Sequence, residues 1–196
     1  MERLAVDMDG VLADVYEQFF RYDEKDFGKR RPQENVIGVE ERKAFPRINE
    51  YVYTKGFFRT APVVKDSVEI VAELNKNYEL FIVSAAMEFP QSLPEKIEWL
   101  NEYFNFLSWQ QIVFCGSKTI VDADIMIDDH FKNLDPFKGT TILFTQPHNQ
   151  LKNDGRHKRV DSWKEIASIL LYTSIPPQPS KYFKYCFACR KGEIFC

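Results

Sequence analysis

The sequence is poor in cysteine, carries no surplus of positive charge and contains no long apolar run. Four of its 196 residues are cysteines, and all but Cys115 lie within positions 186–196. No signal peptide follows the opening residues and no apolar stretch reaches the length of a membrane span, so we expect a cytoplasmic protein with no membrane partner. Cys115 is then a reduced thiol. A formal net charge of −3 argues against a nucleic acid polymer as the main partner.

What the sequence does contain is enough apolar material for a substantial core. Hydrophobic residues make up 44% of the chain and charged residues 28%, which is an ordinary globular composition. The length allows one domain with an insertion, or a domain with a small lid. For any single aromatic residue, a place in the core is the commoner interpretation.

Short apolar runs rich in β-branched residues recur along the chain without clean polar alternation. Such runs are typical of strands that are covered on both faces. Segments with helical spacing lie between them, and Asp161 or Ser162 is expected to cap the last one. Strands alternating with helices predict an α/β fold with a parallel sheet flanked by helices. The runs are residues 3–8, 79–84, 111–114, 124–128 and 140–144, and the helical spacing is clearest over residues 12–20, 68–72, 93–104 and 163–170.

One interval breaks this alternation. Residues 16–61 show no convincing strand and are too long for a crossover, so we expect a small, mostly helical cap inserted after the first strand. The next helix is expected near Val64, and the α/β core comprises residues 1–15 and 62–171. Residues 172–196 are rich in proline, then in lysine and aromatic residues, and we expect a disordered or loosely docked tail.

The tail holds three cysteines that zinc could use. Cys186, Cys189 and Cys196 offer three thiolates, but no fourth ligand follows at a usual spacing. The sequence therefore favours a tail without a metal.

Polar side chains follow several of the predicted strands at the point where each strand ends. The carboxyl ends of parallel strands meet at one edge of the sheet, where ligands bind. Oxygen ligands from two strand ends suit Mg²⁺, and a hydroxyl and an ammonium group suit phosphate oxygens. We therefore expect a magnesium and phosphate site at this edge. The residues are Asp7, Asp9, Ser84, Lys118, Asp128 and Asp129.

These motifs resemble those of a known superfamily. "DMDGV" at 7–11, Ser84, Lys118 and the acidic pair at 128–129 match, in order, the four motifs of the haloacid dehalogenase superfamily, in its phosphatase branch. Longer stretches are similar to the 5′(3′)-deoxyribonucleotidases, and the resemblance spans residues 1–171. They are "GFFR" (56–59), "QQIVFCGSKTIVDADIMIDDH" (110–130), "LFTQPHNQ" (143–150) and "SW" (162–163).

The resemblance implies a covalent phosphatase mechanism. Asp7 is implied as the nucleophile that forms an aspartyl-phosphate, and Asp9 as the general acid and base. Mg²⁺ is implied on Asp7, on the main-chain carbonyl of Asp9 and on the acidic pair. Within that pair we favour Asp129 over Asp128 as the direct ligand, although the spacing leaves both open.

The resemblance also implies how the phosphoryl group is held. Ser84 and Lys118 are implied to bind its oxygens, together with Ala85 in the loop that follows Ser84. Gly10 lacks a Cβ and lets main-chain N–H groups approach the phosphate. A plain turn glycine would look the same.

The cap is implied to select the sugar and the base. Phe57 and Phe58, with Phe19 and Phe20 by helical spacing, are candidates for an aromatic pocket that favours deoxyribose and a pyrimidine. Val15 departs from the family, which has an aromatic residue there, and "SAAM" (84–87) lacks a commonly found proline. Both departures leave the base preference open. For His148, the sequence leaves open whether it supports the site or only the fold.

Three functions are consistent with these residues. The leading one is an Mg²⁺-dependent deoxyribonucleotidase that dephosphorylates deoxyribonucleoside monophosphates such as dUMP or dTMP. The second keeps the machinery but takes another small phosphomonoester, such as a sugar phosphate. The third is a phosphate-binding module without turnover, against which the intact Asp7 and Asp9 argue. The choice between 5′ and 3′ phosphate and the oligomeric state, a homodimer included, stay open.

Overall fold

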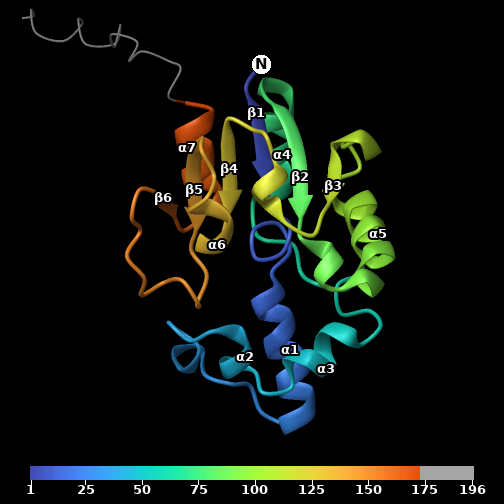
Figure 1. The fold of residues 1–196 in the computed structure, drawn as a ribbon. Helices are drawn as coiled ribbons and strands as arrows, with labels where there is room; N and C mark the ends of the chain where they lie inside the picture. The colour runs from blue at the N-terminus through green and yellow to red at the C-terminus, as the bar shows by residue number, and fades with distance from the viewer. Residues whose placement is uncertain (173–196) are drawn as a thin grey trace, which may run out of the picture.

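The computed structural model describes residues 1–172, and its centre is one six-stranded parallel sheet (Figure 1). The strand order is β3-β2-β1-β4-β5-β6. Five strands fall on the predicted apolar runs, so the expected parallel α/β fold is confirmed. The strands are β1 (Arg3–Val6), β2 (Glu79–Ser84), β3 (Ile112–Phe114), β4 (Ile125–Asp128), β5 (Thr140–Phe144) and β6 (Lys158–Val160).

The apolar pattern of the sequence did not predict β6. This strand pairs with β5 at the edge of the sheet, and its three residues are Lys158, Arg159 and Val160. Only Val160 is buried. An edge strand with two charged residues carries no apolar run, which is why the pattern missed it.

Helices and loops cover both faces of the sheet. Leu4 and Val6 of β1 pack into one apolar cluster with α4, α5 and α7, whereas Ala5 packs on the opposite face with Leu134 of α6. Burial on both faces explains the absence of polar alternation in the strands. The helices are α4 (Ser67–Asn77), α5 (Leu93–Tyr103), α6 (Phe131–Leu134) and α7 (Trp163–Leu170).

Two helix starts are fixed by side-chain caps. Ser162 is the N-cap of α7 and accepts a hydrogen bond from the main-chain N–H of Glu165, which decides between the two expected caps. Asp14 caps α1 (Val15–Phe27). The helical spacing in the sequence begins at Leu12, three residues before the helix itself. The helix expected near Val64 begins at Ser67.

The segment between β1 and α4 forms a separate layer beyond the carboxyl ends of the strands (Figure 1). It holds α1, α2 (Glu41–Ala44) and α3 (Ile48–Tyr53), and no strand. Its apolar side chains form their own cluster, distinct from those of the sheet. We propose residues 16–61 as a cap on a core of residues 1–15 and 62–171.

Two further expectations concern a membrane-spanning helix and the tail. None of the helices within residues 1–172 has the length and apolar composition that a bilayer crossing requires. The expected tail with its three cysteines falls almost wholly outside the described residues, so that expectation stays a prediction.

Candidate active site

The loop after β1 carries two acids into the space between sheet and cap. The main-chain N–H of Asp7 donates to Ile127 at 2.9 Å, which extends the pairing of β1 with β4 by one residue. The Asp7 carboxylate is buried and accepts the N–H of Met8 at 2.7 Å. Asp9 lies further out, with about a third of its side chain exposed. Strand pairing therefore fixes Asp7, whereas Asp9 lies in the loop beyond the strand.

Carboxylates from two strand ends meet around one lysine. Oxygens of Asp7, Asp128 and Asp129 all lie within 4.8 Å of one another. The Lys118 ammonium lies 2.6 Å from Asp7 Oδ1 and 2.5 Å from Asp128 Oδ2. The convergence that the sequence predicted at this edge of the sheet is therefore present.

The acids carry more negative charge than Lys118 can balance. Burial raises the pKa of Asp7 to about 7 against the opposing effect of Lys118. Burial, Asp128 and Asp7 raise the pKa of Asp129 well above its usual value. Burial also opposes ionisation of Asp128, but Lys118, Asn133 and the N–H of His130 outweigh it and lower its pKa. A divalent cation would satisfy this excess charge.

The two acids of the pair have different surroundings. Asp128 accepts hydrogen bonds from the N–H of His130 and from Asn133 besides its contact with Lys118. Asp129 Oδ1 is buried and has no hydrogen-bond partner among residues 1–172. A buried oxygen without a partner fits a metal ligand, so the donor set is suited to a divalent ion, with Asp129 as the freer ligand.

Position 10 requires a glycine because the Asp129 side chain approaches its main chain closely. Its φ is +79°, and a Cβ built on it would lie 2.3 Å from Asp129 Oδ2. Its N–H donates to Ala13 at 2.9 Å, and its carbonyl accepts from Gln146 at 2.5 Å. In this conformation the N–H of Gly10 is engaged within the loop, and the missing side chain makes room for Asp129.

A second lysine, which the sequence did not single out, lies beside Asp9. Lys96 on α5 is 1% exposed, and its ammonium forms an ion pair with Asp9 Oδ2. It also donates to the Ser84 hydroxyl at 3.1 Å, and that hydroxyl lies 3.3 Å from the same Asp9 oxygen. Ser84 therefore lies beside Asp9, and Lys96 contacts both residues.

The helical spacing of α5 hid Lys96. The spacing of Leu93, Ile97 and Leu100 predicts a buried Ile97, but Ile97 is 37% exposed, whereas Lys96 and Trp99 are buried. A lysine three residues before a tryptophan on an apolar face was the only available signal. Long basic side chains usually reach solvent, which favoured the wrong face.

The site opens into a cavity of about 290 Å³ between core and cap. Its core side includes Asp7, Asp9, Ala85 and Lys118. Its cap side is mainly apolar. The lining residues there include Phe19, Ile48, Val52, Phe57 and Phe58.

The aromatic candidates divide into lining and core residues. Phe19, Phe57 and Phe58 reach the cavity, and they are also buried in the cap cluster. Phe20 does not line this cavity; it packs edge-to-face on Phe45 at 5.3 Å. Three of the four candidates are therefore placed where a ligand could contact them.

The "GFFR" stretch is held by a carboxylate from the core. Glu95 on α5 accepts the N–H groups of Gly56 at 2.6 Å and of Phe58 and Arg59 at 3.2 Å. Gln18 donates to the carbonyl of Phe57 at 2.7 Å. Glu95 and Lys96 are adjacent on α5. The same helix turn therefore positions the loop with Phe57 and Phe58 and the contact to Asp9.

The fold and the site together define a class. A parallel sheet with paired acids after its first strand, a serine after the second, a buried lysine and a further acidic pair, all at one edge, is the arrangement of haloacid-dehalogenase-like hydrolases. Solved structures agree on the fold. A haloacid-dehalogenase-like hydrolase of Streptococcus pneumoniae matches with a TM-score of 0.58 at 14% identity, over 86% of this chain and 98% of that one. One of Bacillus subtilis, described as bound to magnesium, matches with a TM-score of 0.55 at 12% identity, over 86% and 98%.

The comparison of sequences narrows the class. The family model described as "5' nucleotidase, deoxy (Pyrimidine), cytosolic type C protein" matches residues 2–175. The 5'(3')-deoxyribonucleotidase of Bacillus subtilis (strain 168) is 40% identical over 171 residues, which cover 86% of this chain and 98% of that protein. The chain belongs to this family of deoxyribonucleotidases within the haloacid dehalogenase superfamily, as its motifs predicted, and it is a phosphoric monoester hydrolase.

Proposed function

We propose that this protein is an Mg²⁺-dependent 5′(3′)-deoxyribonucleotidase that acts on deoxyribonucleoside monophosphates, pyrimidines such as dUMP and dTMP above all. The observation that carries the proposal is the junction of two chemistries in one cavity. Asp7, Asp9 and Lys118 lie at its core end, and Phe19 and Phe57 lie at its cap end. A phosphate fits the first and a flat base the second.

Asp7 is the nucleophile. Its contacts with Lys118 and with the N–H of Met8 fall on Oδ1, so Oδ2 is the oxygen that attacks phosphorus. The bond between phosphorus and the sugar oxygen breaks, and an aspartyl-phosphate forms. Lys118 orients the carboxylate and balances the charge that develops on the phosphoryl oxygens.

Asp9 moves the proton. Ser84 and Lys96 hold its Oδ2, whereas Oδ1 is buried and has no hydrogen-bond partner within residues 1–172. Oδ1 protonates the leaving sugar oxygen and then takes a proton from the water that hydrolyses the aspartyl-phosphate. Ser84 and Lys96 also face the phosphoryl group and bind its oxygens, with the main chain at Ala85.

The acidic edge would hold the metal. Asp7, the main-chain carbonyl of Asp9 and Asp129 would be its ligands, and Asp128 keeps Lys118 in place. When bound, Mg²⁺ offsets the repulsion between the carboxylates and the phosphate. The buried, unpartnered Oδ1 of Asp129 supports this assignment.

A panel of monophosphates tests the substrate class. Purified protein is assayed for phosphate release from dUMP, dTMP, dGMP, UMP and several sugar phosphates, with Mg²⁺ and with EDTA. We expect deoxyribonucleotides to be preferred and EDTA to abolish release. Equal rates on UMP and dUMP, or release from sugar phosphates alone, would overturn the substrate class. No release from any compound would favour a binding module.

A further inference from the structure

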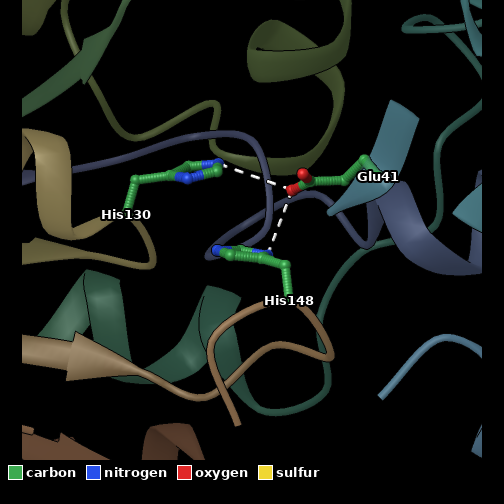
Figure 2. Close-up of side chains that lie close together, drawn as sticks. All are labelled: Glu41, His130 and His148. Atoms are coloured by element: carbon green, nitrogen blue, oxygen red, sulfur yellow. Dashed lines mark ion pairs between the residues drawn. The ribbon is translucent and has the colours of Figure 1, made fainter. Parts of the chain in front are cut away.

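A second cluster of metal-ligating side chains lies beside the phosphoryl site. Figure 2 shows the Glu41 carboxylate directed at ring nitrogens of His130 and His148. Glu41 comes from α2 of the cap, His130 from the turn between β4 and α6, and His148 from the loop between β5 and β6. The cluster therefore joins the cap to two loops of the core.

The three side chains present a convergent donor set. Glu41 Oε1 lies 3.0 Å from His148 Nδ1 and 3.6 Å from His130 Nε2. The two imidazole rings stack with centroids 4.2 Å apart and planes 18° apart. Both nitrogens lie near one carboxylate oxygen. Because each nitrogen lone pair lies in the plane of its ring, the two stacked rings would turn toward each other to bind one ion together with Glu41.

The hydrogen bonds of His148 call for a positive charge at that point. Its Nε2 lies 3.0 Å from the main-chain oxygen of Asp129, which can only accept, so Nε2 carries the proton. In the neutral ring Nδ1 then holds a lone pair that faces the Glu41 carboxylate. The Tyr16 hydroxyl lies 3.2 Å from Nδ1 and has one proton to donate, so it can satisfy only one of the two facing acceptors.

We propose that Glu41, His130 and His148 form a second metal site, for a divalent transition metal of the Zn²⁺ class, next to the Mg²⁺ site; His130 Nε2 lies 3.9 Å from Asp129 Oδ2. Two imidazoles and one carboxylate are a donor set that Zn²⁺ and Co²⁺ favour, whereas Mg²⁺ prefers oxygen ligands alone. The ligand atoms lie within 4.8 Å of one another, close enough for one ion to contact all three with modest adjustment.

The site keeps an open side and spans the seam between cap and core. Glu41 and His130 line both the main cavity and an adjoining cavity of about 310 Å³, which also contacts Lys132 and Lys152. Three protein ligands with an open position can accept a water or a ligand oxygen. Because Glu41 is the only one of the three on the cap, a bound ion ties α2 to the core beside the substrate cavity.

Direct metal binding tests the proposal. The full-length chain is prepared with Cys186, Cys189 and Cys196 all replaced by serine, so that tail thiols bind no metal, and excess Mg²⁺ fills the carboxylate site. Co²⁺ is titrated in while its visible absorption is recorded, and Zn²⁺ binding is measured by calorimetry. The variants are Glu41→Gln, His130→Asn and the control Glu40→Gln, which removes a charge from the adjacent, exposed residue paired with Lys43.

We expect one Co²⁺ with an imidazole-type spectrum in the parent and in Glu40→Gln. Loss of one of three ligands should weaken binding by about 100-fold or more in Glu41→Gln and His130→Asn. Equal binding in all four proteins, or no such spectrum in the parent, would overturn the site; a proton shared by His148 and Glu41 would then account for their contact. None of these readouts uses a substrate, so the proposed function can fail or hold independently.

Discussion

The two sides of the substrate cavity differ in how their residues are held. At the core edge, Asp7, Asp128 and Lys118 follow strands and are locked by ion pairs and main-chain hydrogen bonds. On the cap, Phe57 and Phe58 lie in a loop that depends on Glu95, a residue of the core, for its main-chain contacts. The core edge therefore fixes the positions of the reacting atoms. The cap loop contacts the substrate from the other side of the cavity. Substitutions at the core edge should therefore lower kcat, and substitutions that affect the cap loop with Phe57 and Phe58 should act mainly on KM.

The largest effect is expected for Asp7→Asn. Asparagine keeps the shape of the side chain but is not a nucleophile, so kcat should fall by at least about 10⁴-fold. The fold should survive, which circular dichroism and thermal unfolding would check. A near-normal rate in this variant would remove the covalent mechanism.

Gly10→Ala should be the next most severe. The new Cβ would clash with Asp129 Oδ2, so kcat should fall by about 10²–10³-fold and Mg²⁺ should bind more weakly. Gly28→Ala is a matched control, since φ is +71° there but nothing lies within 4 Å of the added Cβ. It should cost about 1–2 kcal/mol of stability and leave kcat unchanged. Equal kcat values for the two variants would contradict the close-approach argument.

Lys96→Met should reduce kcat by about 10²-fold, because Asp9 loses the cation that holds its Oδ2. KM for the substrate should change less. Steady-state kinetics would be compared with those of Lys76→Met, which removes an exposed lysine paired only with a neighbouring glutamate on the same helix. If both variants kept the parental kcat, Lys96 would be a structural residue.

Glu95→Gln should have the smallest effect and a different character. Weakening the carboxylate's hydrogen bonds to the "GFFR" main chain costs about 1–2 kcal/mol, or roughly 5–30-fold in KM, with kcat nearly kept. Glu98→Gln, one turn along and bound only to the Arg59 side chain, is the control. A fall in kcat at constant KM would contradict the division between cap and core.

The difference between the core edge and the cap also explains which site residues could be predicted from the sequence. Asp7, Asp9, Lys118 and the acidic pair were found because each lies at the end of an apolar strand or within a few residues of it, and topology alone brings strand ends together. Lys96 was missed because its role depends on which face of α5 is buried. The apolar Ile97 favoured the face that is in fact exposed. Phe19 and Phe20 are adjacent in sequence, yet only Phe19 reaches the cavity. Glu41 could not be found from the sequence, because its partners His130 and His148 lie in two distant loops and meet it only in the folded structure.

The most direct test of the central claim is to find where the phosphoryl group goes. Asp9→Asn should still form some aspartyl-phosphate but lose it slowly, because the group that activates water is absent. The variant is mixed with dUMP and Mg²⁺, quenched within one turnover, digested and analysed by mass spectrometry. The account predicts a phosphoryl group on Asp7. Phosphate on another residue, or an unmodified Asp7 in a variant that still releases phosphate, would contradict it.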